Sequence, residues 1–243
     1  MKKFAALLAV LALTAFAAHA TNPVSLGYSN NTTVQNSGSD ACANGTLFVN
    51  HDGSFENGYG WQYGGVVAPY YGAFAEGYDL GAGFVCCDAF WVSTLPGYYF
   101  GQTCDAYVWE GGAGTLPGAV LCVVPSNVLV NVPNWPTIGQ NDVSMGVAVS
   151  GPFTVGYWGN WPGAMLGYFC AADQNGFGGY PWTNIAPLLG YPTGWNDPSI
   201  IPRWGTTQSM GIGAYFSTSS CPGRCNPIPA ESPTWGSIKA LFE

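Results

Sequence analysis

Apolar residues in this chain recur in short runs rather than at helical spacing. The runs are rich in Val, Phe, Tyr and Trp and are separated by glycine- and proline-containing segments, a pattern typical of β-strands. We predict strands at residues 46–50, 84–94, 104–110, 119–124, 145–150, 153–159, 166–173 and 209–216.

Turn-forming dipeptides lie between these runs. The 35 glycines and 18 prolines are spread along the whole chain, which excludes long helices almost everywhere. Short strands with frequent turns predict an all-β fold, a single-domain antiparallel β-sandwich of the jelly-roll type. The turn dipeptides are Asn44-Gly45, Asp52-Gly53, Asn57-Gly58, Pro96-Gly97, Pro117-Gly118 and Asn175-Gly176.

The first twenty residues have the pattern of a signal peptide. Lys2 and Lys3 precede an apolar run, and Ala18-His19-Ala20 provides a small-x-small cleavage site. We therefore expect a secreted or cell-surface protein without a transmembrane span in its mature chain. The predicted organisation is a signal peptide (1–20), an N-terminal extension (21–45), a β-sandwich domain (46–216), a Ser/Pro/Cys-rich linker (217–233) and a C-terminal tail (234–243).

The mature chain is strongly acidic. Loss of Lys2 and Lys3 leaves three basic residues against thirteen acidic ones, so its formal charge is 3 − 13 = −10. Nucleic-acid binding is excluded as a function, because no basic surface is present to neutralise phosphates.

Eight cysteines remain after cleavage, and an even number in an exported chain indicates disulfides. A structural zinc site would need a second ligand pair beside Cys221-x₃-Cys225. Neighbouring residues of a strand point to opposite faces, so Cys86 and Cys87 should have different partners. The pair in "CPGRC" is a candidate to close on itself. The predicted disulfide cysteines are Cys42, Cys86, Cys87, Cys104, Cys122, Cys170, Cys221 and Cys225.

The ordered strings "HDGSFENGYGW", "CDAYVWE", "FTVGYWG" and "MGIGAYF" resemble a jelly-roll accessory module of secreted bacterial exoenzymes. The resemblance covers about residues 46–216. Longer strings, "WGNWPGAMLGYFCAADQNGFGGYPWTNIAPLLGYPTGW" and the tail "AESPTWGSIKALFE", resemble an uncharacterised family of stand-alone secreted bacterial proteins. The resemblance implies a fold and a cellular location, and it implies no reaction.

The stretch "HDGSFENGYGW" gathers charge in a chain in which 7% of residues are charged. One interpretation is that Asp52-Gly53 and Asn57-Gly58 form turns, with Glu56 accepting backbone N–H bonds. The other is a structural calcium site, because a hard cation takes several oxygen ligands. Its candidate ligands are Asp52, Glu56, Asp173 and Asn175.

Motifs for nucleophilic or metal-assisted catalysis are missing from the sequence. It contains no G-x-S-x-G, H-E-x-x-H or P-loop motif, and His51 is the one histidine of the mature chain. A pair of carboxylates remains the alternative, because only their separation in space identifies a glycosidase.

Tryptophans concentrate between residues 158 and 204. Exposed Trp beside Asn, Asp and Gln can stack on sugar rings, whereas the other interpretation places these rings in the core. The candidate ligand-binding residues are Trp158, Trp161, Trp182 and Trp195.

The tail "TWGSIKALFE" follows the proline-bearing linker. Trp235, Ile238, Leu241 and Phe242 fit a short amphipathic helix, either docked on the sandwich or exposed as a sorting signal for export machinery. We predict the sorting signal, because tertiary docking rarely needs a stiff spacer.

These observations predict a non-catalytic module with a glycan or a protein as ligand, or with a structural role. A secreted hydrolase, such as a two-carboxylate glycosidase, is the alternative.

Overall fold

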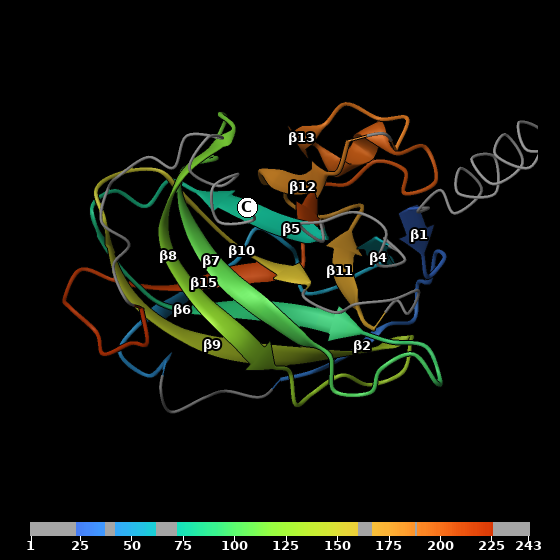
Figure 1. Ribbon diagram of the computed structural model, residues 1–243. Helices are drawn as coiled ribbons and strands as arrows, with labels where there is room; N and C mark the ends of the chain where they lie inside the picture. Colours follow the sequence, from blue (N-terminus) through green and yellow to red (C-terminus); the bar gives the residue numbers. More distant parts are fainter. Residues whose placement is uncertain (1–22, 37–41, 62–71, 160–166, 188, 226–243) are drawn as a thin grey trace, which may run out of the picture.

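Two β-sheets pack face to face in the computed structural model, which describes residues 23–36, 42–61, 72–159, 167–187 and 189–225 (Figure 1). The predicted signal peptide, Trp161 and the tail at 234–243 lie outside the described residues. The described part contains no α-helix; a single 3₁₀ turn, η2, spans Pro198–Ile200.

The first sheet has nine strands. Its central strand β6 pairs with β9 along one edge and with β15 and β11 along the other. The parallel pair β2–β9 is the exception in an otherwise antiparallel sheet. The strands are β1 (Pro23–Ser25), β2 (Thr33–Gln35), β3 (Thr46–Phe48), β4 (Asn57–Trp61), β6 (Gly83–Ser93), β9 (Thr137–Val149), β11 (Phe169–Asp173), β14 (Ser209–Met210) and β15 (Ile212–Ser217).

The second sheet has six antiparallel strands in the order β13-β12-β5-β10-β7-β8. They are β5 (Ala73–Tyr78), β7 (Thr103–Gly111), β8 (Pro117–Val128), β10 (Phe153–Gly159), β12 (Pro181–Ile185) and β13 (Gly194–Asn196). From β4 to β12 the chain changes sheet at nearly every connection, as in a jelly roll. The predicted all-β, jelly-roll-like sandwich is confirmed.

Side-chain alternation separates an interior from two outer faces. Phe90 and Val92 of β6 point into the main core between the sheets, where they meet Val155 and Tyr157 of β10. Ala89 and Trp91 of β6 point the other way, into a smaller cluster on the outer face of the nine-stranded sheet. Each sheet therefore has an inner face that holds the fold together and an outer face available to carry function.

The sandwich extends beyond the predicted boundaries. β1 and β2 belong to the nine-stranded sheet, so the predicted extension at 21–45 contributes strands to the domain. Asn57-Gly58, predicted as a turn, begins the fully buried strand β4. Glycine is needed at position 58 because a Cβ there would overlap the Leu26 side chain.

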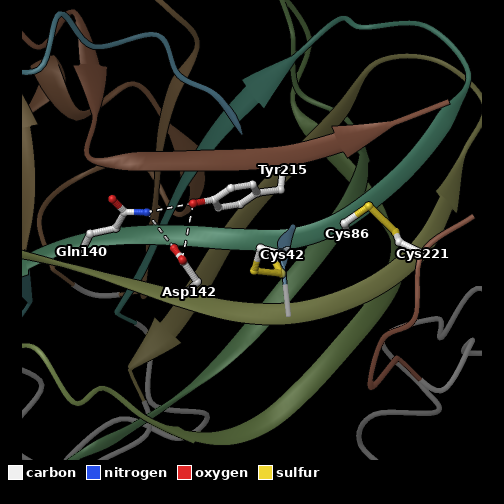
Figure 2. The surroundings of a disulfide bond; sticks show 7 residues. Cys42, Cys86, Gln140, Asp142, Tyr215 and Cys221 are labelled. Atoms are coloured by element: carbon white, nitrogen blue, oxygen red, sulfur yellow. Dashed lines mark hydrogen bonds between the residues drawn. A yellow bond between two sulfur atoms is a disulfide. The ribbon is translucent and has the colours of Figure 1, made fainter. Parts of the chain in front are cut away.

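Six cysteines form three disulfides: Cys42–Cys87, Cys86–Cys221 and Cys122–Cys225. Cys86 and Cys87 have different partners, as predicted, and Figure 2 shows the first two bonds around β6. The register of β6 shifts between Val85 and Cys87, which places Cys86 at a bulge.

Two predictions about the cysteines are wrong. Cys221 and Cys225 do not bond to each other, because each reaches a strand of a different sheet, so the predicted linker is tied to the sandwich as far as Cys225. Cys104 and Cys170 are unpaired, and both side chains are fully buried in the main core. Burial raises the pKa of the Cys104 thiol to about 12, and it also raises the pKa of the Cys170 thiol.

We expect two titratable thiols in the unfolded, unreduced protein and none in the native protein, because both free thiols are buried and protonated. Mass spectrometry after alkylation in denaturant should find two labels, on Cys104 and Cys170. Labelling of the native protein, or a count of zero after unfolding, would contradict this arrangement.

Candidate functional site

The segment after β3 carries the charged residues singled out in the sequence. Asp173, at the end of β11, is fully buried, and its Oδ2 accepts the backbone N–H of Asp52 at 2.9 Å. Its Oδ1 accepts the N–H groups of Asn175 at 3.0 Å and Gly176 at 2.7 Å. One carboxylate thus joins the segment around Asp52 to the turn after β11.

Glu56 joins the same two segments through a second set of hydrogen bonds. Its Oε2 accepts the N–H of Gln174 at 2.8 Å, and its Oε1 accepts the Ser54 hydroxyl at 3.1 Å. The same hydroxyl lies 2.7 Å from Asp52 Oδ1. The structure therefore places the side chains of Asp52 and Glu56 beside one hydroxyl, whereas Asp173 contacts Asp52 and Asn175 through their backbone.

These contacts correspond to the first interpretation of the segment, in which carboxylates accept backbone N–H groups. Among the described residues, no group of three or more His, Cys, Asp or Glu side chains is arranged to hold a metal ion. Calcium at Asp52, Glu56, Asp173 and Asn175 stays a prediction.

A fourth carboxylate, Glu76 of β5, was missed by the sequence analysis. It lies between Phe74 and Tyr78, whose alternation places all three side chains in the interior. Oε1 accepts Asn50 Nδ2 and the Tyr180 N–H, both at 2.7 Å, and Oε2 accepts the Met210 N–H at 2.8 Å. The signal for it was an acidic residue at an inward position of the otherwise apolar run "AFAEGY".

Asp88 of β6 is the second interior acid. It shares the inward face of the strand with Phe90 and Val92, and neither of its oxygens has a hydrogen-bond partner within the described residues. Burial raises the pKa of Asp88 well above its usual range and raises the pKa of Glu76 to about 8. Both acids lie inside the sandwich rather than in an open cleft, which is not where a glycosidase places its pair.

An open pocket of about 240 Å³ lies on the outer face of the nine-stranded sheet. Trp91 and Gln140, neighbours on β6 and β9, lie on this face; Val34 of β2 lines one side and the residues from Leu47 to Gly53 the other. Among the described residues, no acidic side chain lines this pocket. Its lining residues are Val34, Asn36, Leu47, Val49, His51, Gly53, Trp91 and Gln140.

His51 is the polar side chain buried in the pocket wall. Its ring packs on Phe55 and Trp91, with both centroid distances at 4.6 Å, and it is 5% exposed. Nδ1 accepts the Gly53 N–H at 3.1 Å, whereas Nε2 has no hydrogen-bond partner among the described residues. Burial lowers the pKa of His51 to about 4, although the neighbouring Asp52 carboxylate acts in the opposite direction. The imidazole is therefore neutral at physiological pH.

Gln140, at the edge of this pocket, belongs to a polar network that crosses β6. Its Nε2 donates to Asp142 Oδ1 at 2.8 Å and lies 3.2 Å from the Tyr215 hydroxyl, which in turn lies 3.4 Å from Asp142 Oδ2. Figure 2 shows the three side chains meeting from β9 and β15 above the central strand. The network fixes the orientation of the Gln140 amide at the pocket.

The predicted tryptophans gather on the outer face of the other sheet. Trp158 of β10, Trp182 of β12 and Trp195 of β13 are all half-buried there. Trp158 and Trp195 have ring centroids 6.0 Å apart. Tyr107 and Trp109 of β7, which the sequence analysis did not select, complete the cluster: Trp109 stacks on Tyr107 and contacts Trp195 edge-to-face.

No protein-family model, curated protein or solved structure matches this chain.

We expect the stability of the protein to fall as the pH rises from about 6.5 to about 8, above the range in which His51 acts in the opposite direction because burial lowers its pKa to about 4. The folded state holds protons on Glu76 and Asp88 more tightly than the unfolded chain does, so stability is fully present below the ordinary carboxyl pKa values and is lost as the pH rises. The slope should approach about 1.4 kcal/mol per pH unit for each group. Urea unfolding at a series of pH values measures it.

Substitution of each acid separates their contributions. Asp88→Asn should flatten the pH dependence and leave the protein at least as stable as the wild type at pH 8, because it removes an acid without hydrogen-bond partners. Glu76→Gln should cost about 1–3 kcal/mol even at pH 5, because its amide nitrogen faces N–H donors. A pH-independent wild type, or an Asp88→Asn variant with an unchanged slope, would refute the assignment.

Proposed function

We propose that the protein is an exported, non-catalytic β-sandwich module that binds glycans through the outer face of its six-stranded sheet. The observation that carries the proposal is the convergence of Tyr107, Trp158, Trp182 and Trp195 from four strands onto that face. We name these four residues the aromatic face.

Small residues form the sheet surface between these rings. Ala75 of β5 pairs with Gly156 of β10 on one side and with Trp182 of β12 on the other. Ala73 pairs with Trp158 and Asn184 in the same way. A Cβ at Gly156 would overlap the backbone of β5, so this position has to stay small. These small residues are themselves buried, so the half-buried aromatic rings around them form the accessible part of this face.

A sugar ring is the ligand that this chemistry suits best. The C–H faces of a pyranose are apolar and stack on indole rings, while its hydroxyls need nearby polar groups. Asp105 and Asn184, whose strand positions place them on the same face, can supply those groups. Stacking of this kind needs no charge on the ligand, which fits a mature chain with a formal charge of 3 − 13 = −10.

Export is supported by the covalent structure. Disulfides form and persist in oxidising compartments, and three are present here. No helix of the described segments is long and apolar enough to cross a membrane. Cleavage of the predicted signal peptide and recognition of the tail by sorting machinery are parts of the same proposal, as is calcium binding at Asp52 and its neighbours.

We expect Trp158→Ala and Trp195→Ala each to weaken glycan binding about fivefold or more, because loss of one stacking ring removes about 1–3 kcal/mol of contact. A glycan array identifies the ligand, and titration calorimetry with it measures the loss. Trp135→Ala, which truncates a half-buried tryptophan on the other sheet, is the matched control and should bind normally.

A protein ligand is the competing outcome. No binding to any glycan by the folded protein, together with capture of a protein by the wild type that Trp158→Ala abolishes, would replace the glycan with a protein on the same face. Equal effects of Trp135→Ala and Trp158→Ala would refute the aromatic face as the site.

A further inference from the structure

We propose that the aromatic face binds a glycan with free, protonated amines, and that Asp105 is the residue that selects it. This inference rests on the proposed function, because it names the class of glycan for the same face. Asp105 of β7 pairs directly with Trp158 of β10 and lies two residues before Tyr107. Its side chain therefore shares the outer face with the two rings on which a sugar would stack.

Asp105 gives this face a negative charge. The six strands of the sheet contain three charged residues, all acidic: Glu76, Asp105 and Glu110. Glu76 is buried in the interior. Glu110 pairs with Phe153 of the main core, which places it on the inward side of β7 at the exposed end of the strand. Among the strand residues of this sheet, Asp105 is thus the only charged one at an outward position.

A β-bulge fixes the direction of the Asp105 carboxylate. The pairing register shifts between Cys104 and Ala106, so Pro125 and Ser126 of β8 lie opposite the single residue Asp105. The Ser126 N–H donates to Asp105 Oδ1 at 2.8 Å. Ser126 has a φ of +56°, the one positive value among the described residues other than glycine. Residues with a side chain rarely adopt this conformation, and where they do it often serves a functional site.

The carboxylate can accept further hydrogen bonds. Its two oxygens offer about four acceptor positions, and the Ser126 N–H uses one of them. The bond between Asp105 and Ser126 lies in an exposed position, within reach of a ligand. Burial, together with the nearby Asp105 carboxylate, raises the pKa of Tyr107 to about 12. An anion close enough to act on the Tyr107 hydroxyl also attracts a cation that lies against the same ring.

A protonated amino sugar matches this combination of groups. Its ammonium donates to the carboxylate and is attracted to the ring faces of Tyr107 and Trp158, while the C–H face of the pyranose stacks as before. N-acetylation removes the positive charge, and a uronic acid would bring a second negative charge beside Asp105. The formal charge of the mature chain, 3 − 13 = −10, attracts a cationic glycan over a longer range.

Two β-linked hexamers that differ only in N-acetylation test the inference with the full mature protein. In a mildly acidic buffer of low salt, titration calorimetry should show that the glucosamine hexamer binds about fivefold or more tightly than the N-acetylglucosamine hexamer. This preference should fall as the salt concentration is raised, because interactions between exposed charges are screened.

A matched pair of variants assigns the preference to one residue. Asp105→Asn keeps an oxygen for the Ser126 N–H but removes the charge, so it should bring the affinities for the two hexamers to within about twofold of each other. Glu110→Gln removes the same charge from the same strand, away from the aromatic face, and should keep the wild-type preference. Trp158→Ala should weaken the binding of both hexamers, because stacking serves either sugar.

Equal affinities of the wild type for the two hexamers, or an unchanged preference in Asp105→Asn, would overturn the inference. The aromatic face would then remain the glycan site as long as Trp158→Ala weakens binding. Equal losses of preference in Asp105→Asn and Glu110→Gln would assign it to the net charge of the chain, which also overturns the role of Asp105. If Asp105→Asn does not fold, a wild-type preference that is independent of salt contradicts the inference. Failure of the folded protein to bind any glycan would overturn the inference and the proposed function together.

Discussion

The arrangement of this sandwich depends on carboxylates that accept backbone N–H groups at one end of the strands. Asp173 and Glu56 hold the segments Asp52–Ser54 and Gln174–Gly176 together, and Glu76 holds Tyr180 and Met210. Apart from Met210 of β14, these residues lie in turns outside the strand ladders, so their amides depend on side-chain acceptors. Side-chain oxygens therefore accept the N–H groups that strand pairing would satisfy inside a sheet. They hold in place the backbone beside His51 and the segment that leads into β12.

The few charges of the chain are consequently used for the fold more than for the surface. Two glycines lie where the backbone passes close to these acids: a Cβ at Gly179 would collide with Glu76 and Asn50, and one at Gly176 would collide with Asp173. In the motif "DQNGFGGY", backbone N–H groups donate to three acids, Glu56, Asp173 and Glu76. The outer faces of the two sheets differ. Indole rings gather on the six-stranded sheet, and a pocket lined by a neutral imidazole lies on the nine-stranded sheet.

Alternation and turn chemistry were sufficient to predict the sandwich, because every predicted run contains a strand. β1, β2 and β13 were missed because three residues are too few for a pattern to be recognised. β5 and β12 were missed as well, because Glu76 interrupts the apolar run of the first and Pro181 and Asn184 that of the second. Asn57-Gly58 was misread as a turn because its glycine serves close packing against Leu26. Two of the four candidate calcium ligands, Asp52 and Glu56, meet through their side chains at the Ser54 hydroxyl. Glu76 and Asp88 were passed over, since an acid in an apolar strand matches no site motif. Disulfide partners depend on three-dimensional proximity, which sequence spacing does not contain.

The adjacent cysteines of β6 have a topological consequence. Cys87 reaches back to Cys42, Cys86 reaches forward to Cys221, and Cys122–Cys225 overlaps the second bond, so the three covalent loops together enclose every peptide bond from residue 42 to residue 225. One proteolytic cut anywhere in that interval, even between the two neighbouring cysteines, leaves two pieces joined through sulfur. Damage to a surface loop within this interval then does not become loss of a fragment.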